Sequence, residues 1–314
     1  MQTKKNIYFW ASDISNNSGE GILSNSFIKN YLKKNKNFTF KNLNLGDKYQ
    51  KKNNFINNKY RYEGFFHKYI HPLLGIYKLW KIFLSQKKPC YLNYLPLWNF
   101  IIFLLLPPGT IIGPITGNVF RKNFISKLLV LFELVSLLII KIRFKEIHFS
   151  HNFYNIKYGL DKNRFKRNFI LKDFVYKKKS KKKIFDLIIY FRNNSKLDKK
   201  YVLNLLINLG SSNYKYKFAI IGDKLKVNQA KNFGFLPRNR AIDVISKAKF
   251  AISNPENLYS YFVQDCLSNN VKVFYNKNLR KYEIFKKNSM VPIEFKSSVN
   301  DARTILKNLK KTNP

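Results

Sequence analysis

The chain has 314 residues, 45% of them hydrophobic, so it is long enough for two domains and apolar enough for a packed core. This composition excludes global disorder. Its 59 Lys and Arg residues against 17 Asp and Glu residues give a net charge of +42, which indicates an anionic partner such as nucleic acid, anionic lipid or a phosphorylated substrate. Lys, Asn and Ile are abundant and Ala and Gly scarce, as in AT-rich genomes, and we assign most of the charge to that bias.

Cysteine and histidine usage argues against a disulfide framework and a metal site. Cys90 and Cys266 are the two cysteines and lie far apart, which fits a reduced cytoplasmic protein. His148 and His151 form a close pair, but no further Cys or His lies near them in the sequence, so we expect no metal and no cofactor. The N-terminus does not resemble a signal peptide, because its apolar run is short and soon meets Asp13.

Two apolar stretches raise the question of a membrane span. Residues 100–115 are interrupted by Pro107, Pro108 and Gly109, and residues 128–140 are few and contain Glu133. Because a spanning helix needs about 20 apolar residues, we interpret both as buried elements of a soluble fold. A location at an anionic membrane surface stays open for the second stretch, because basic residues flank it: Lys127, Lys141 and Arg143.

The first half of the chain alternates apolar strands with helices. The pattern predicts strands over 5–12, 38–45, 91–96, 110–116 and 146–150. It predicts helices over 22–34, 70–86, 97–106 and 124–142, and a Gly-containing loop over 13–21. Strands without polar alternation, separated by helices, are typical of a parallel sheet that is covered on both faces.

A charge run interrupts this order, and the alternation then begins again. Further strands are predicted over 184–191, 216–222, 249–253 and 271–275, and helices over 199–210, 238–248, 256–269 and 299–311. We therefore expect an α/β protein with two Rossmann-like parallel-sheet domains facing a cleft. The expected boundaries are an N-terminal domain over 1–172, a basic linker over 173–183, a C-terminal domain over 184–298, and a final helix and tail over 299–314.

Glu256 stands directly after a predicted strand, in a chain with few acids. Ligands of parallel sheets bind beyond the carboxyl ends of the strands. Asn254 is a good N-cap and Pro255 a good first helical residue, so Glu256 is expected in the first turn of a helix. The alternative is that Glu256 only complements the helix dipole.

The run "NFGFLPRNRAIDVISKAKFAISNPENLYSYFVQDCLSNNVKVF" (232–274) resembles the donor half of a glycosyltransferase with the GT-B fold, family four type. Gly234–Pro237 match the turn that precedes a helix in that family. Ser253 and Glu256 match two positions of its next motif. The family's second glutamate is replaced by Gln264, with Asp265 beside it. Its proline before the serine and its glycine after the helix are replaced by Ile252 and Asn269.

Other segments also resemble this family, and they follow the family's order along most of the chain. The stretch 188–200 resembles the family's arginine and lysine loop, with Arg192 at the arginine and Lys196 or Lys199 at the lysine. "AIIGD" (219–223) resembles its next strand. "NNSGEGILSNSFI" (16–28) resembles its Gly-rich loop, and "GPITGN" (113–118) an acceptor-side loop of related bacterial enzymes.

The resemblance implies a retaining, metal-independent enzyme that moves a sugar from a nucleotide-sugar to a glycan or lipid-linked acceptor. The charge that develops on the leaving diphosphate would be neutralised by Arg and Lys side chains, and Glu256 would bind sugar hydroxyls at the catalytic centre. The donor-binding residues would be Arg192, Lys196, Lys199, Gly222, Phe235, Leu236, Ser253, Asn257, Leu258, Gln264 and Asp265. The acceptor-side and Gly-rich loop residues would be Gly19, Glu20, Gly21, Thr116, Gly117 and His151.

Each assignment has a structural alternative. Arg192 could pair with a surface carboxylate, the lysines could be ordinary solvated residues, Gly19–Gly21 could be a tight turn, and His151 could simply be exposed. At the level of the whole protein, a GT-B-like binder without catalytic activity is one alternative, because the family motif departs at three positions. A nucleic-acid-binding protein is another, supported by charge alone, and we expect no nucleic-acid partner. The expected location is the cytoplasm, with the inner membrane face left open.

Overall fold

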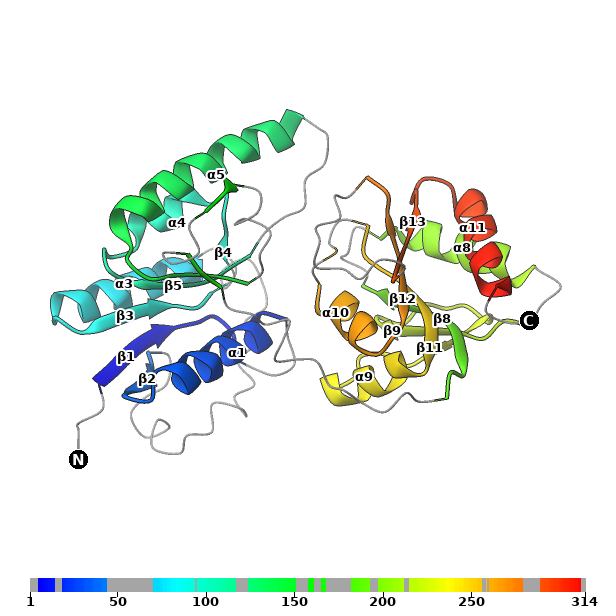
Figure 1. Cartoon of the computed structure of the whole chain (residues 1–314), viewed down its shortest axis with the longest axis horizontal. Coiled ribbons are helices and arrows are strands. Elements are labelled where there is room, and N and C mark those ends of the chain that lie inside the picture. The colour runs from blue at the N-terminus through cyan, green and yellow to red at the C-terminus, as the bar shows by residue number, and fades with distance from the viewer. Residues whose placement is uncertain are drawn as a thin grey trace. The chain divides into compact units, whose positions relative to one another are not determined.

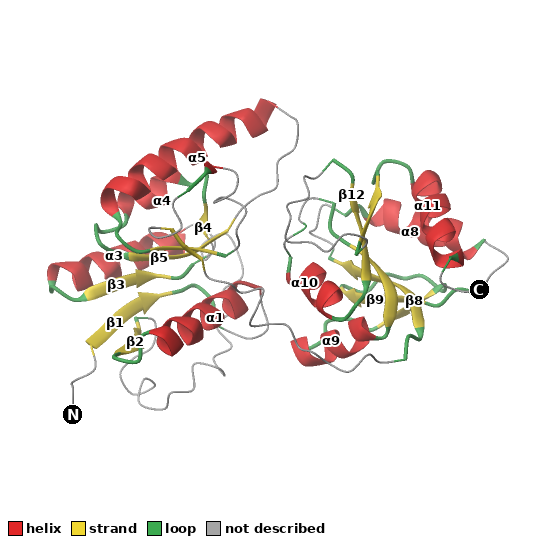
Figure 2. Cartoon of the chain, viewed as in Figure 1, coloured by secondary structure: helices red, strands yellow, loops and turns green. Residues whose placement is uncertain are grey.

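The computed structural model describes residues 5–14, 19–43, 70–93, 95–116, 124–150, 158–160, 165–167, 182–192, 197–211, 215–255, 258, 260–278 and 289–311. The described residues up to 167 form one compact unit, and those from 182 onward form a second (Figure 1). Strands and helices alternate in both units, as the sequence predicts (Figure 2). Most of the predicted linker lies outside the described residues.

The first unit is built on a parallel sheet with the strand order β2-β1-β3-β5-β6-β7, in which β4 also pairs with β5. Its strands are β1 (Lys5–Trp10), β2 (Phe38–Asn42), β3 (Lys88–Tyr91), β4 (Leu95–Pro96), β5 (Ile111–Thr116), β6 (Ile147–Phe149) and β7 (Phe165–Arg167). Its helices are α1 (Gly19–Lys34), α3 (His71–Leu84), α4 (Phe100–Leu105) and α5 (Phe124–Arg143).

The strand order determines which helix covers which face of the first sheet. The connection from β1 to β2 moves in one direction along the sheet, whereas those to β3, β5 and β6 move in the other. Because parallel crossovers are right-handed, α1 covers one face, and α3, α4 and α5 cover the opposite face. Figure 1 shows α1 on one side of this sheet and α4 and α5 on the other.

The second unit is built on a doubly wound sheet with the strand order β10-β9-β8-β11-β12-β13. All neighbouring strands in this sheet are parallel. Its strands are β8 (Phe185–Phe191), β9 (Phe218–Gly222), β10 (Ala230–Asn232), β11 (Ala248–Ile252), β12 (Lys272–Asn276) and β13 (Met290–Ile293). Its helices are α8 (Lys199–Gly210), α9 (Arg238–Ser246), α10 (Tyr261–Ser268) and α11 (Ser298–Lys310). The winding direction reverses between β8 and β11, the switch point at which such sheets bind ligands.

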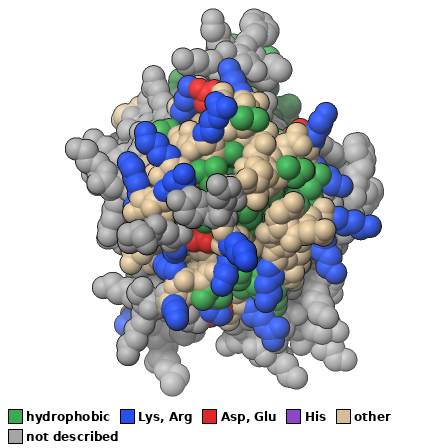
Figure 3. Space-filling view, turned by 90° about the vertical axis from the view of Figure 1, so that its right-hand side faces the viewer, with side chains coloured by type: hydrophobic (Ala, Val, Ile, Leu, Met, Phe, Trp, Pro, Cys, Tyr) green, Lys and Arg blue, Asp and Glu red, His purple; other side chains and the backbone are tan. Residues whose placement is uncertain are grey.

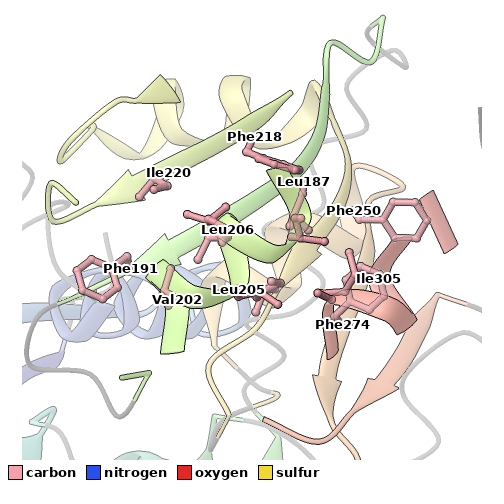
Figure 4. Packing of buried hydrophobic residues seen from close by; sticks show 14 of the residues in the cluster. Leu187, Phe191, Val202, Leu205, Leu206, Phe218, Ile220, Phe250, Phe274 and Ile305 are labelled. Carbon is pink, nitrogen blue, oxygen red and sulfur yellow. The ribbon is translucent and has the colours of Figure 1, made fainter. Parts of the chain in front are cut away.

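The core of the second unit follows from helical and strand periodicity. Helix α8 begins at Asp198, whose side chain accepts a hydrogen bond from the Lys200 N–H at 3.0 Å. Its apolar residues recur at spacings of three and four and are all buried: Val202, Leu205, Leu206 and Leu209. They pack with Ile305 of α11 and with strand residues such as Phe250 and Phe274, whose rings stack at 5.2 Å (Figure 4).

Several short strands differ from the sequence prediction. The strand expected over 91–96 is instead β3, which ends at Tyr91, and the separate two-residue β4. β7, β10 and β13 were not predicted. Each has only three or four residues and lies at an edge of its sheet, so it carries too little periodicity to be recognised.

The prediction that both apolar stretches are buried is wrong for their helices. Leu131 and Leu138 of α5 and Ile101 and Leu104 of α4 are exposed, because a helix in an outer layer contacts the sheet along one side only. β5, the strand part of the first stretch, is buried through Ile115, whereas the helices bury single residues such as Phe103 of α4 and Ile140 of α5. In the described part of the chain, no helix combines the length and the apolar character that crossing a bilayer requires.

Candidate functional site

The carboxyl edge of the second sheet brings several predicted donor residues together. Gly222 of β9 pairs with Phe191 of β8, and Ile252 of β11 pairs with β8 two residues earlier. Arg192 and Ser253 directly follow these strand ends. Both therefore leave the sheet at the same edge, at the switch point between β8 and β11.

Two glycines with positive φ shape the backbone at this edge. Gly222 has φ +105°, and a Cβ atom there would lie 2.1 Å from the Phe191 carbonyl oxygen. Its N–H donates to the carbonyl of Gly234 at 3.0 Å, and Gly234 itself has φ +66°. The Asp223 N–H donates to the Phe191 carbonyl at 2.8 Å. Positive φ at both positions and the close approach of the Phe191 carbonyl at Gly222 are the conditions that require glycine.

Two of the predicted phosphate-binding cations are exposed near this edge. Arg192 is exposed and has no ion-pair partner among the residues that the structure describes. Lys199 is exposed in the first turn of α8. A guanidinium and an ammonium with no carboxylate partner are suited to binding a diphosphate. Lys196 lies outside the described residues.

An exposed aromatic ring follows the glycine turn. Phe235 is 61% exposed, and Leu236 beside it is half-buried. A large apolar ring that faces water can stack on the flat face of a ligand. The turn "GFLP" therefore presents the kind of side chain that a nucleotide base or a sugar ring would contact.

Ser253 and Leu258 hold the loop after β11 rather than reach outward. Both are fully buried. The Ser253 N–H donates to the Phe274 carbonyl at 3.0 Å, and its hydroxyl donates to the Asn254 carbonyl at 3.3 Å. Their side chains thus support the loop, and a ligand would meet the backbone or the neighbouring residues.

The helix after β11 begins later than the sequence predicts. Asn254 is not its N-cap: α10 begins at Tyr261, and the Ser260 hydroxyl accepts from the Val263 N–H at 3.3 Å. Both candidates are good capping residues, so local sequence could not decide between them. Pro255 is held outside the helix because its carbonyl accepts from the Asn276 side chain at 3.1 Å. Glu256 and Asn257 lie outside the described residues.

The predicted ribose position lies beside a buried ion pair. Arg238 Nη2 donates to Asp265 Oδ1 at 2.8 Å, and the guanidinium lies 4.9 Å from the centre of the Tyr261 ring. Burial raises the pKa of Asp265 to about 6, although Arg238 opposes this shift. One carboxylate oxygen is thus already bound within the protein, while the adjacent Gln264 is half-buried. Sequence reasoning missed Arg238, although it directly follows the "GFLP" turn.

A second polar cluster lies at the carboxyl edge of the first sheet, where the winding direction changes between β1 and β3. The Ser12 hydroxyl donates to the Asn93 side chain, and the Ser24 hydroxyl donates to the Leu92 carbonyl at 2.7 Å. Asp13 beside them is also buried. Sequence reasoning missed Asn93 because it lies inside the strand expected over 91–96. The available signal was that polar residues directly follow two apolar strands.

The Gly-rich segment is helical rather than part of the preceding loop. Gly19–Gly21 form the first turn of α1, with Glu20 exposed and Gly21 buried. An acidic residue stabilises this position because it faces the positive end of the helix dipole. Thr116 is the last residue of β5, and Gly117 and His151 lie outside the described residues.

The described part of the chain shows no metal-binding cluster, and one of its faces shows no concentrated charge. It holds no group of three or more His, Cys, Asp or Glu side chains suited to a metal ion. His148 lies against Glu146, with 3.2 Å between Nε2 and Oε1. On the face drawn in Figure 3, Lys and Arg side chains are scattered rather than gathered into one patch.

Comparison with known proteins supports the fold. No protein-family model matches the sequence, and no curated protein does. A putative UDP-N-acetylglucosamine 2-epimerase from Listeria monocytogenes has a TM-score of 0.57 at 8% identity, covering 99% of this chain and 89% of its own. The UDP-GlcNAc 2-epimerase of Methanocaldococcus jannaschii, in complex with UDP-GlcNAc and UDP, has a TM-score of 0.55 at 11% identity. This likeness covers 97% of this chain and 93% of the epimerase chain.

A glycosyltransferase from Rickettsia africae has a TM-score of 0.53 at 13% identity, covering 99% of this chain and 89% of its own. Together with the two parallel sheets, these likenesses show an α/β fold of the two-domain, Rossmann-like GT-B class.

Proposed function

We propose that this protein is a bacterial glycosyltransferase of family four type, which moves a sugar from a nucleotide-sugar donor to a glycan or lipid-linked acceptor in cell-surface polysaccharide synthesis. The observation that carries the proposal is the position of Arg192 at the switch point of the second sheet, exposed and beside the closely packed turn at Gly222. The structural likenesses agree with it, because they include a glycosyltransferase and an epimerase bound to UDP-GlcNAc and UDP.

The residues of this edge suit a reaction whose leaving group is an anion. The bond between the anomeric carbon and the diphosphate oxygen breaks, and the diphosphate keeps the electron pair. Arg192 with Lys196 or Lys199 would stabilise that charge without a metal ion. The oxygen of an acceptor hydroxyl forms the new glycosidic bond, and its proton passes to the departing diphosphate. Retention of the anomeric configuration is part of the proposal.

Other residues would position the donor. Phe235 would contact the base or sugar, Gln264 would hydrogen-bond the ribose hydroxyls, and Glu256 would bind the hydroxyls of the sugar. The main chain at Gly222 and Gly234 would lie close to the diphosphate. The acceptor would bind at the carboxyl edge of the first sheet, near the Gly19–Gly21 turn and Thr116.

A donor-induced change in thermal stability tests the proposal. The wild-type protein is melted with UDP-, GDP-, ADP- and CMP-sugars, and we expect one nucleotide class to raise the melting temperature. Arg192→Ala should abolish the shift, while Arg303→Ala, which removes an exposed arginine of α11, should retain it. Glu256→Ala should keep nucleotide binding but stop the release of nucleotide in the presence of acceptor.

Other results would favour other functions. A folded protein that no donor stabilises would contradict the proposal. A shift without transfer to any acceptor would favour a binding protein that has lost catalysis, which the departures at Ile252, Gln264 and Asn269 also suggest. Conversion of the free donor sugar itself would indicate an epimerase. Steeply salt-dependent nucleic-acid binding that no nucleotide-sugar affects would favour the nucleic-acid alternative.

A further inference from the structure

The outward sides of α3, α4 and α5, together called the outer helix face, expose an unusual amount of apolar surface. Most of the exposed large hydrophobic side chains among the described residues lie on these helices. In the described part of the second unit, four large hydrophobic side chains are exposed, and they are scattered: Ile184, Ile207, Phe235 and Val299. Soluble monomers rarely expose large contiguous apolar patches, and those that occur mark interaction sites.

Helix α5 shows the feature most clearly, because its outward side is apolar while its buried side holds two polar residues together with Leu137 and Ile140. Glu133 and Ser136 are fully buried, whereas Leu131, Leu138 and Ile142 are 54%, 61% and 84% exposed. The Tyr158 hydroxyl donates to the buried Glu133 carboxylate. A helix that faces water carries its polar residues outward. An apolar outward side is expected where that side meets an apolar phase.

The three helices form one continuous layer. The Trp80 indole N–H of α3 donates to the Leu105 carbonyl of α4 at 2.8 Å. The rings of Phe100 in α4 and Phe132 in α5 lie 5.3 Å apart. The layer also exposes Tyr77 of α3, so its apolar surface extends beyond α5. Figure 1 shows α4 and α5 side by side over the first sheet.

The charge on this layer has a single sign. The sequence contains no Asp or Glu between Glu63 and Glu133, and Glu133 is buried. Exposed lysines accompany the apolar residues: Lys78 and Lys81 on α3, and Lys141 near the end of α5. Lys81 Nζ lies 4.6 Å from the centre of the Tyr77 ring, which places an ammonium directly beside the apolar surface.

We propose that the outer helix face docks onto an anionic lipid bilayer. Its leucine and isoleucine side chains enter the boundary between headgroups and acyl chains, and Lys78, Lys81 and Lys141 bind lipid phosphates. A second copy of the chain fits this face less well, because a two-fold interface would set lysine against lysine. The face deepens the proposed function by bringing the first unit to a lipid-linked acceptor, although docking itself does not depend on catalysis.

Flotation with lipid vesicles tests the docking. The wild-type protein is expected to float with vesicles of phosphatidylcholine and phosphatidylglycerol, and far less with phosphatidylcholine alone. Replacing Leu131, Leu138 and Ile142 together by Gln should weaken binding by at least about tenfold. Lys78→Gln with Lys81→Gln should weaken it by roughly 10–30-fold. The matched control Ile207→Gln, at a 52% exposed position of α8, should float like the wild type.

The outcomes separate docking from catalysis. Failure of the folded wild type to float with anionic vesicles would overturn the proposal, as would equal binding by the Gln variants. So would a wild-type dimer in sedimentation that the Leu131, Leu138 and Ile142 replacements dissociate. The donor-induced thermal shift, measured on the same proteins, should not change. Docking without a donor shift would contradict the proposed glycosyl transfer alone, and a donor shift without docking would contradict this inference alone.

Discussion

A buried carboxylate in the second unit offers a sharp test of the packing between α11, β13 and α8. Asp301 is 2% exposed and accepts three hydrogen bonds. The Tyr201 hydroxyl donates to Oδ2 at 2.7 Å, and the N–H groups of Glu294 and Phe295 donate at 2.9 and 2.8 Å. Burial and the nearby Asp301 carboxylate raise the pKa of Tyr201, so the phenol stays protonated and acts as the donor.

The expected cost follows from these contacts. A hydrogen bond to a charged group contributes about 1.5–3 kcal/mol, and an unsatisfied buried donor costs about 1–3 kcal/mol. Asp301→Ala leaves two N–H groups and a phenol without their acceptor, so we expect a loss of about 3–5 kcal/mol in the free energy of unfolding. Tyr201→Phe removes one donor of three and should cost about 1–2 kcal/mol. The double variant should cost less than the sum, because no phenol is left unsatisfied.

Urea unfolding followed by two probes checks this prediction. Trp10, Trp80 and Trp98 all lie in the first unit, so tryptophan fluorescence reports that unit, whereas circular dichroism reports both. Asp301→Ala should shift the circular dichroism transition. As a control, Asp243→Ala breaks an ion pair with Lys247 whose side chains are 34% and 32% exposed, and it should cost less than about 1 kcal/mol. A loss below about 1 kcal/mol for Asp301→Ala, or a shift seen by fluorescence alone, would refute the reasoning.

Three further predictions concern two glycines and one acid. Gly75→Ala should destabilise the protein by about 1–3 kcal/mol in urea unfolding despite the better helix propensity of alanine, because its Cβ would lie 2.2 Å from the fully buried Trp10 ring. Gly222→Ala should cost at least about 2 kcal/mol and remove the donor-induced thermal shift, because φ is +105° and a β8 carbonyl lies 2.1 Å from the new Cβ; an unchanged shift would count against the proposed donor edge. The raised pKa of Asp265, about 6, means that its contribution to stability is present below about pH 4 and is lost as pH rises to about 6. Relative to Asp265→Asn, the wild type should therefore lose roughly 3 kcal/mol across that window, and parallel pH profiles of the two proteins would contradict the shift.

The sequence by itself determined the elements whose signals are local. Helix α8 has the predicted bounds because its apolar residues repeat at helical spacing and Asp198 caps its first turn. The parallel sheets followed from apolar strands that alternate with helices, and with them the edge where Arg192 and Ser253 leave the second sheet. These features depend on residues that lie close together in the chain, within one or two helical turns or strands. A single sequence therefore contains the signals that predict them.

Only the tertiary structure decided the features that depend on distant partners. Ser12 meets Asn93 because β1 and β3 are neighbours in the sheet although far apart in the chain. The choice of Ser260 rather than Asn254 as the N-cap of α10 depends on the contact of Asn276 with Pro255. The side of α5 that faces the sheet is decided in the same way. Hydrophobic periodicity finds a helix, but which side meets the sheet depends on a buried partner for Glu133 that the local sequence does not contain.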